Sequence, residues 1–143
     1  AKEADKMYRK AIKKYPNAGA LYAEYGELLW LQKDFNCINQ WESGIKNDPN
    51  YSGNYYFAAR YYHLTTDKVW ALVYGEIFVN MESYSSRTAE MKTLLLESYK
   101  KFFLNDPKAK PSKNVTEFTT AFTDVMNRNA AVTNNGITTE TLI

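Results

Sequence analysis

The sequence has little cysteine, histidine and glycine, and each scarcity excludes a kind of site. Its 143 residues include one cysteine, Cys37, and one histidine, His63. A lone cysteine forms no internal disulfide, and the two residues together supply too few ligands for a cysteine-rich zinc site. A glycine-rich phosphate loop is missing too, because Asn135-Gly136 lacks a following lysine and serine. We therefore expect no metal and no cofactor.

Long apolar runs and a strong net charge are also missing. The longest apolar run, Trp70 to Tyr74, stops at Gly75-Glu76, whereas a membrane-spanning helix needs about 20 apolar residues. The net charge of +2 is too small to favour nucleic acid. Hydrophobic residues at 45% and charged residues at 24% are ordinary for a globular domain. We expect neither membrane insertion nor nucleic-acid binding.

The two ends of the sequence and its single cysteine bear on location. The chain opens inside a helical pattern without a methionine, and it ends at Leu142-Ile143 as another pattern begins. We therefore expect a segment of a longer protein, whose targeting signals could lie elsewhere. No signal peptide is visible, and Cys37 is compatible with a reducing cytosol. We expect a cytoplasmic location.

What the sequence does contain is an internal repeat with an offset of 33 residues. A small residue is followed by an aromatic residue four later, a small residue three later and a proline five later. The first copy consists of Ala4, Tyr8, Ala11 and Pro16, and the second of Cys37, Trp41, Gly44 and Pro49. The residues after each proline repeat as well, as Tyr22-x-x-Tyr25-Gly26-x-x-Leu29 and Tyr55-x-x-Ala58-Ala59-x-x-Tyr62. Self-similarity at this period is typical of helical repeat arrays.

Apolar residues recur at helical spacing along the chain, and no stretch alternates for long enough to predict a strand. Proline with asparagine marks a turn at Pro16-Asn17 and at Pro49-Asn50. The first two predicted helices cover the residues before Pro16 and residues 18–32, and the third is capped by Asp34. The fourth covers 51–65, and the fifth covers 67–81 with Asp67 as its cap. A longer sixth helix is capped by Ser85 or Ser86, and a seventh is opened by Asn114 with Glu117 in a capping box. Residues Pro107 to Lys113 read as a connector before the seventh helix.

Three small residues fall in the middle of predicted helices, at Gly26, Gly44 and Ala59. Glycine there costs roughly 1 kcal/mol relative to alanine. A close approach of two helices would explain why glycine is used despite this cost. An aromatic side chain of one helix would fill the space left by the small residue of the other. We expect this packing at each of the three positions.

The pattern resembles the tetratricopeptide repeat, which runs W-x-x-L-G-x-x-Y, then A-x-x-x-F, then P. The resemblance implies an all-α fold of antiparallel helical hairpins stacked into a right-handed superhelical solenoid. It extends from Ala4 to Tyr62 and then weakens, because among the positions 33 residues further on only the aromatic Tyr74 matches. The implied organisation is the second helix of a truncated repeat at 1–16, a complete repeat at 17–49, a degenerate repeat at 50–82, and a further hairpin or C-terminal cap, itself truncated, at 83–143.

The resemblance implies a non-catalytic scaffold that binds a protein or peptide in a concave groove lined by the first helix of each repeat. The groove-facing positions would be Ala20, Ala23, Glu27 and Trp30, followed by Gly53, Tyr56, Arg60 and His63. From these we expect the ligand-binding residues to be Glu27, Trp30, Tyr56, Arg60 and His63. The best-known clamp of the family grips chaperone-tail carboxylates with lysine, arginine and asparagine. These faces do not form such a clamp, so we predict no chaperone-tail binding.

Several alternatives remain open from the sequence. Tyr56 with Arg60 either contacts a ligand or packs against the next hairpin. The first helix lacks a partner on its far side, so the chain could be an assembly module with weak homo-oligomerisation. It could also be the accessory part of an enzyme, with chemistry in the flanks or at His63. A Cys37–His63 dyad is disfavoured because Cys37 occupies a packed small-residue position, and we expect no catalytic residue.

Overall fold

The computed structural model describes residues 2–65, 67–104 and 115–138, and within these ranges the chain is helical with no strand. This confirms the all-α prediction for the described residues. The seven α-helices are α1 (Lys2–Lys14), α2 (Gly19–Leu31), α3 (Cys37–Asn47), α4 (Ser52–Leu64), α5 (Lys68–Met81), α6 (Ser86–Phe103) and α7 (Glu117–Arg128), followed by the 3₁₀ turn η1 (Ala130–Thr133).

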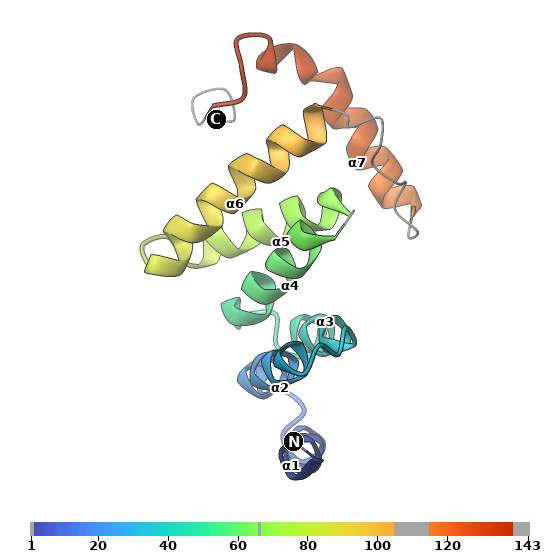
Figure 1. Ribbon diagram of the computed structural model, residues 1–143, viewed down its shortest axis with the longest axis vertical. Helices are drawn as coiled ribbons and strands as arrows, with labels where there is room; N and C mark the ends of the chain where they lie inside the picture. Colours follow the sequence, from blue (N-terminus) through green and yellow to red (C-terminus); the bar gives the residue numbers. More distant parts are fainter. Residues whose placement is uncertain (1, 66, 105–114, 139–143) are drawn as a thin grey trace.

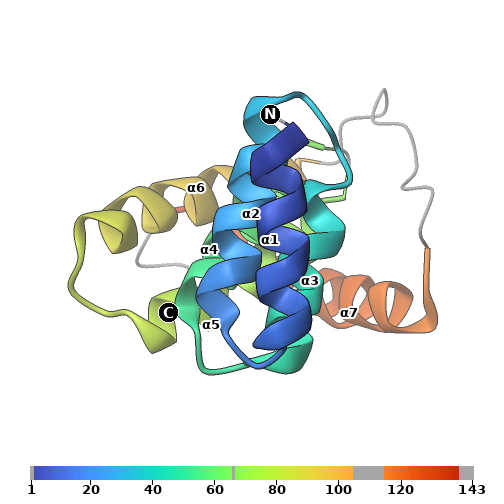
Figure 2. The same ribbon diagram turned by 90° about the horizontal axis from the view of Figure 1, so that it is seen from below.

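The helices follow one another along the molecule from α1 at one end to α7 at the other (Figure 1). Each helix from α1 to α5 contacts the next helix in the chain. In addition, α2 contacts α4 and α4 contacts α6, so alternate helices touch. Seen along the long axis, α1 lies alongside α2 at the N-terminal end (Figure 2). The sequence of α2 is apolar nearly all round, which agrees with its position among α1, α3 and α4.

The predicted helix starts are confirmed at some elements and wrong at others. At α6, the Ser85 hydroxyl accepts from the Thr88 backbone N–H at 3.2 Å, as expected of a cap. The predicted Asn114 cap lies outside the described residues, and α7 begins after Thr116 instead. The Thr116 hydroxyl accepts from the backbone N–H of Thr119 at 3.2 Å. The capping box is therefore formed by two threonines, and Glu117 is the first residue of the helix.

Two predicted aspartate caps make no capping hydrogen bond. The N-cap position of α3 is Asn36, and the Asp34 carboxylate accepts from the Asn36 backbone N–H at 2.9 Å and from its side-chain amide at 2.8 Å. Asp34 therefore closes the turn before the helix, because α3 begins later than predicted. Asp67 does occupy the N-cap position of α5, but its side chain makes no hydrogen bond to the helix start.

The mid-helix glycines allow close approach, but by different neighbours. A Cβ on Gly26 would fall on the Trp41 indole, closer than non-bonded atoms approach. The prediction of an aromatic partner is therefore confirmed at Gly26. At Gly44 it is wrong, because the space is filled by the buried amide of Asn54. That amide donates to the Gly19 carbonyl at 3.0 Å and so joins α4 to the start of α2.

Two kinds of tyrosine contact recur along the chain, and the first recurs at the 33-residue offset of the sequence pattern. The Tyr22 hydroxyl donates to the Pro16 carbonyl at 2.8 Å, and the Tyr55 hydroxyl donates to the Pro49 carbonyl at 3.0 Å. A second recurrence joins a carboxylate on one helix to a tyrosine hydroxyl on the next. Its pairs are Asp5 with Tyr25, Glu42 with Tyr62 at 2.8 Å, and Glu76 with Tyr99 at 3.0 Å. This contact continues to α6, beyond Tyr62, where the sequence pattern weakens.

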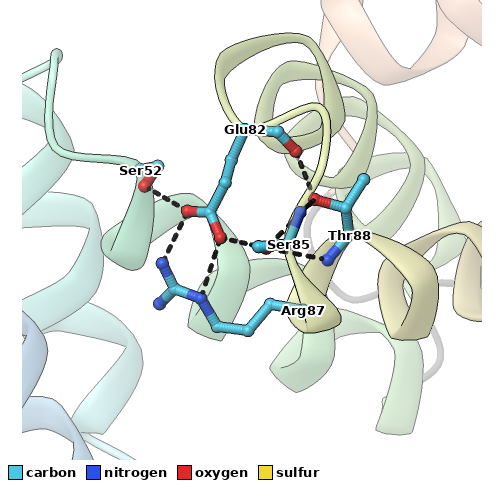
Figure 3. Close-up of polar contacts among 5 residues, drawn as sticks. All are labelled: Ser52, Glu82, Ser85, Arg87 and Thr88. Carbon is cyan, nitrogen blue, oxygen red and sulfur yellow. Dashed lines mark hydrogen bonds and ion pairs between the residues drawn. The ribbon is translucent and has the colours of Figure 1, made fainter.

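A polar cluster around Glu82 fixes the turn between α5 and α6 (Figure 3). The Glu82 carboxylate accepts from the Arg87 guanidinium at 2.6 and 3.2 Å, from the Ser52 hydroxyl at 2.9 Å, and from Ser85. The Glu82 backbone carbonyl accepts from the Thr88 hydroxyl. Burial alone would raise the pKa of Glu82, but the hydrogen bonds from Arg87, Ser85 and Ser52 hold it below its ordinary value. The cluster joins the end of α5 to the starts of α4 and α6.

Candidate functional site

A pocket of about 220 Å³ opens between α2 and α4. One face of α2 and one face of α4 form most of its lining, because the contributing positions on each of these helices follow helical spacing, and α3 adds one residue. The lining residues are Glu27, Trp30 and Leu31 on α2, Trp41 on α3, and Phe57, Arg60, Tyr61 and Leu64 on α4. The α4 residues occupy positions i, i+3, i+4 and i+7, which is one continuous stripe.

Aromatic rings form the inner part of the pocket. Trp41 is only 2% exposed and stacks on Phe57 with ring centroids 5.4 Å apart. Trp30 meets Tyr61 edge-on at 6.0 Å and Trp41 at 6.3 Å. The Trp41 indole N–H donates to the Ala23 carbonyl at 3.2 Å, which fixes its ring in place. The rings hold each other in position, so the pocket is formed before any ligand binds.

Two exposed leucines form the apolar part of the pocket's rim. Leu31 at the end of α2 is 75% exposed, and Leu64 at the end of α4 is 66% exposed. Both exposed leucines line the pocket, and they lie on the two helices that form most of it. Apolar rim residues around a preformed aromatic floor are typical of a surface that buries a partner's side chain.

Two charged side chains of opposite sign also line the pocket, and their surroundings differ. The Arg60 Nε lies 3.5 Å from the Glu90 carboxylate on α6, and its guanidinium lies 5.3 Å from the centre of the Tyr56 ring. Glu27 makes no hydrogen bond and no ion pair with any residue that the structure describes. Within the part of the chain that the structure describes, the positive charge therefore has a partner of opposite sign and the negative charge has none.

Tyr56 lies on the side of α4 that faces α6. Its side chain is 6% exposed, and its hydroxyl donates to the Glu90 carboxylate at 2.7 Å. The Arg60 and Arg87 guanidinium groups each lie 5.3 Å from the centre of its ring. Burial, together with the hydrogen bond to Glu90, raises the pKa of Tyr56. Of the two alternatives left open by the sequence, these contacts correspond to packing against the next hairpin.

His63 also faces α6. Its Nδ1 lies 2.8 Å from the Ser98 hydroxyl, and its Nε2 lies 3.5 Å from the Glu97 carboxylate. Burial lowers the pKa of His63, and the nearby charges of Lys101 and Lys68 lower it further. Serine, histidine and glutamate are the residue types of a hydrolytic triad, but Ser98 is completely buried, so a substrate cannot reach its hydroxyl. The trio joins α4 to α6.

Cys37 is fully buried at the start of α3. Burial raises the pKa of its thiol to about 11, and a neutral, inaccessible thiol is a poor nucleophile. Across the described ranges, no three acidic, histidine or cysteine side chains are grouped to hold a metal ion. No helix in this part of the chain is both long and apolar enough to cross a membrane.

The structure brings three of the five predicted site residues together, namely Glu27, Trp30 and Arg60. Tyr56 and His63 lie outside the pocket, between α4 and α6. Sequence reasoning missed the remaining lining residues, which are Leu31, Trp41, Phe57, Tyr61 and Leu64. One signal could have found three of them. The repeat pattern uses Tyr55, Ala58, Ala59 and Tyr62, and this leaves Phe57, Tyr61 and Leu64 as a second apolar row on the same helix.

No protein-family model matches the chain, and a search of curated proteins finds no significant match.

Proposed function

We propose that the chain is a non-catalytic, tetratricopeptide-like scaffold that binds a segment of another protein in the groove between α2 and α4. The pocket with its aromatic floor and exposed leucine rim is the observation that carries the proposal. The 33-residue repeat and the recurring tyrosine contacts support a stacked, right-handed array of hairpins. In such an array α2 and α4 would line the concave face. A cytoplasmic location is part of the proposal.

The size of the pocket favours a side chain over a small-molecule ligand. Pockets that hold drug-sized molecules are roughly 300–1,000 Å³, and this one has about 220 Å³. A single large side chain of a partner fits this scale. Tryptophan and tyrosine, which form the inner wall, are also the residues that most often dominate the energy of protein interfaces.

The test is peptide selection followed by a rim substitution. Peptides are selected from a random phage-displayed library with the wild-type chain, and their affinities are measured by calorimetry. The double variant Leu31→Glu/Leu64→Glu places charge on two exposed side chains and should leave the fold intact. Losing two leucine contacts should weaken binding at least about tenfold. The matched control is Tyr84→Glu, at a fully exposed side chain away from the pocket.

If the selected peptides bound the wild type and the double variant with equal affinity, the pocket would not be the binding site. A library that yields no peptide at all would remove the peptide-binding function. Circular dichroism of all three proteins checks that a loss of binding is not a loss of helix.

Assembly is the second candidate function, and one observation favours it. None of the described residues of α1 is buried, and Met7 on this helix is 71% exposed. A second chain could cover this side of α1 and produce weak self-association. Sedimentation at increasing protein concentration tests the idea, with Met7→Asp expected to return the mass to that of the monomer. A monomer mass for the wild type at every concentration would contradict it.

A further inference from the structure

We infer that the bound segment carries a large apolar side chain and, close to it in space, a lysine or arginine. This inference rests on the proposed function, because it specifies the ligand of the same pocket. It draws on one juxtaposition. Among the described residues the Glu27 carboxylate has no charged partner, and it lines an aromatic pocket whose other charged lining residue, Arg60, already contacts Glu90.

The charge available to a ligand is negative. Arg60 is held by the Glu90 carboxylate at 3.5 Å and by the Tyr56 ring and hydroxyl, the latter at 3.4 Å. An acidic ligand would have to compete with Glu90 for this guanidinium while approaching Glu27. A basic ligand meets no competing cation at Glu27 within the described part of the chain. Charge complementarity therefore favours a basic residue in the partner.

The geometry of α2 places the carboxylate beside a tryptophan. Glu27 and Trp30 are three residues apart on the helix, so their side chains are neighbours, and both line the pocket. A lysine or arginine can lay its methylene stem along the indole and carry its charge to Glu27. The indole also attracts a cation placed over its face. One side chain would thus use both residues.

The aromatic floor of the pocket indicates that the ligand also has an apolar side chain. Trp41, Phe57 and Tyr61 offer ring surface and few polar groups below the rim. A charged group placed there would lose its water without gaining a partner. A leucine, methionine or phenylalanine side chain would be stabilised by the same surface. The two side chains of the ligand must lie close together in space, because Glu27 and the floor belong to one small pocket. Side chains two residues apart on a strand, or three or four apart on a helix, meet this condition.

A positional-scanning peptide library tests the inference. Each library fixes one residue type at one of the four positions on either side of a fixed leucine, with all other positions randomised. Binding is measured to four proteins. These are the wild type, Glu27→Gln, Glu27→Lys and Glu24→Gln. Glu24 is the matched control, because it is an exposed glutamate on the same helix that does not line the pocket.

We expect the wild type and the Glu24→Gln control to select lysine or arginine near the leucine. Glu27→Gln should bind these peptides about two- to fivefold more weakly, as for an ion pair at a rim open to solvent. Glu27→Lys should reverse the selection toward aspartate or glutamate. The preference of the wild type for basic residues should also shrink as salt is raised.

Three results would overturn the inference. Apolar peptides selected without any basic preference would contradict it while leaving the proposed function intact. An equal basic preference in wild type and Glu27→Lys would place the basic contact elsewhere. Concentration-dependent dimers that are lost in Leu31→Glu/Leu64→Glu would make a second copy of the chain the occupant. If no peptide binds at all, the proposed function fails as well, and this outcome is distinct from the other three.

Discussion

The hydroxyl of Tyr62 on α4 donates a 2.8 Å hydrogen bond to the carboxylate of Glu42 on α3. The same carboxylate accepts from the Tyr74 hydroxyl on α5 at 3.2 Å. Glu42 thus joins three consecutive helices from a half-buried position. Hydrogen bonds to a charged group contribute more than neutral ones, so this carboxylate is a strong point of attachment among α3, α4 and α5.

Replacing Glu42 should therefore destabilise the fold. Glu42→Ala leaves two tyrosine hydroxyls without their acceptor, and we expect the free energy of unfolding to fall by about 1–3 kcal/mol. Tyr62→Phe removes one of the two bonds and should cost about 1 kcal/mol. Urea unfolding followed by circular dichroism measures both. Glu24→Ala, at an exposed position on α2, should change the free energy by less than about 0.5 kcal/mol. A loss as large at Glu24 as at Glu42 would contradict the assignment.

Alkaline pH should destabilise the fold through the buried tyrosines. Burial, together with the hydrogen bond and charge of Glu42, raises the pKa of Tyr62 and of Tyr74 above the ordinary tyrosine value. Burial and Glu76 raise the pKa of Tyr99 in the same way. The unfolded chain loses these protons near pH 10 while the folded chain keeps them. The stabilisation is thus present below about pH 10 and is lost as the pH rises through the folded-state pKa values.

Melting temperatures measured from about pH 8 to pH 11 test this dependence. Tyr99→Phe should reduce the fall of the melting temperature with rising pH, because it removes one of the titrating groups. A melting temperature that does not change across this range in the wild type would show that the three hydroxyls are not protected in the fold.

Acidic pH should loosen the turn between α5 and α6 through Glu82. Its pKa is held below the ordinary value by the bonds from Arg87, Ser85 and Ser52, although burial acts in the opposite direction. A lowered pKa means that the stabilisation is present above the ordinary glutamate pKa of about 4.3 and is lost as the pH falls through the folded-state value. Glu82→Gln should be less stable than the wild type at neutral pH. Its free energy of unfolding should also fall less steeply as the pH is lowered. If the free energy of unfolding fell equally steeply with decreasing pH in both proteins, this role of Glu82 would be contradicted.

Gly26→Ala should destabilise the protein, although alanine is the better helix former by roughly 1 kcal/mol. The added methyl group would collide with the Trp41 indole, and overpacking of this kind typically costs about 1–3 kcal/mol. Thr93→Ala, at an exposed position in α6, provides the control and should be neutral or slightly stabilising. Thermal unfolding of both variants decides the sign. A stabilised Gly26→Ala would mean that the two helices can move apart at no cost.

The sequence predicted those features that depend on spacing within a helix. Helix positions, the Gly26 approach and the joint placement of Glu27 and Trp30 follow from the 3.6-residue period and from the repeat. The prediction was less complete at α4, whose apolar residues surround the helix. The spacing does contain a second apolar row with Phe57 and Tyr61, but periodicity alone could not tell which row faces α2, which faces α5 and which faces α6.

The positions of Tyr56 and His63 depended on a helix that the sequence pattern does not reach. Both share a predicted face with Arg60, and the contacts of Glu90 and Ser98 on α6 cover that part of the face. The repeat weakens after Tyr62, so no spacing rule predicted where α6 would lie. The tyrosine–carboxylate bonds between helices were missed for the same reason, since they depend on how two helices cross.

Trp41 has two roles, because it fills the space above Gly26 and forms part of the floor of the pocket. A substitution there would change both the hairpin and the site. Descendants of this gene that acquire a new partner would therefore keep the floor and vary the rim, at Glu27, Leu31 and Leu64. The same division offers a route for engineering, in which three surface positions are randomised on a floor that is left untouched.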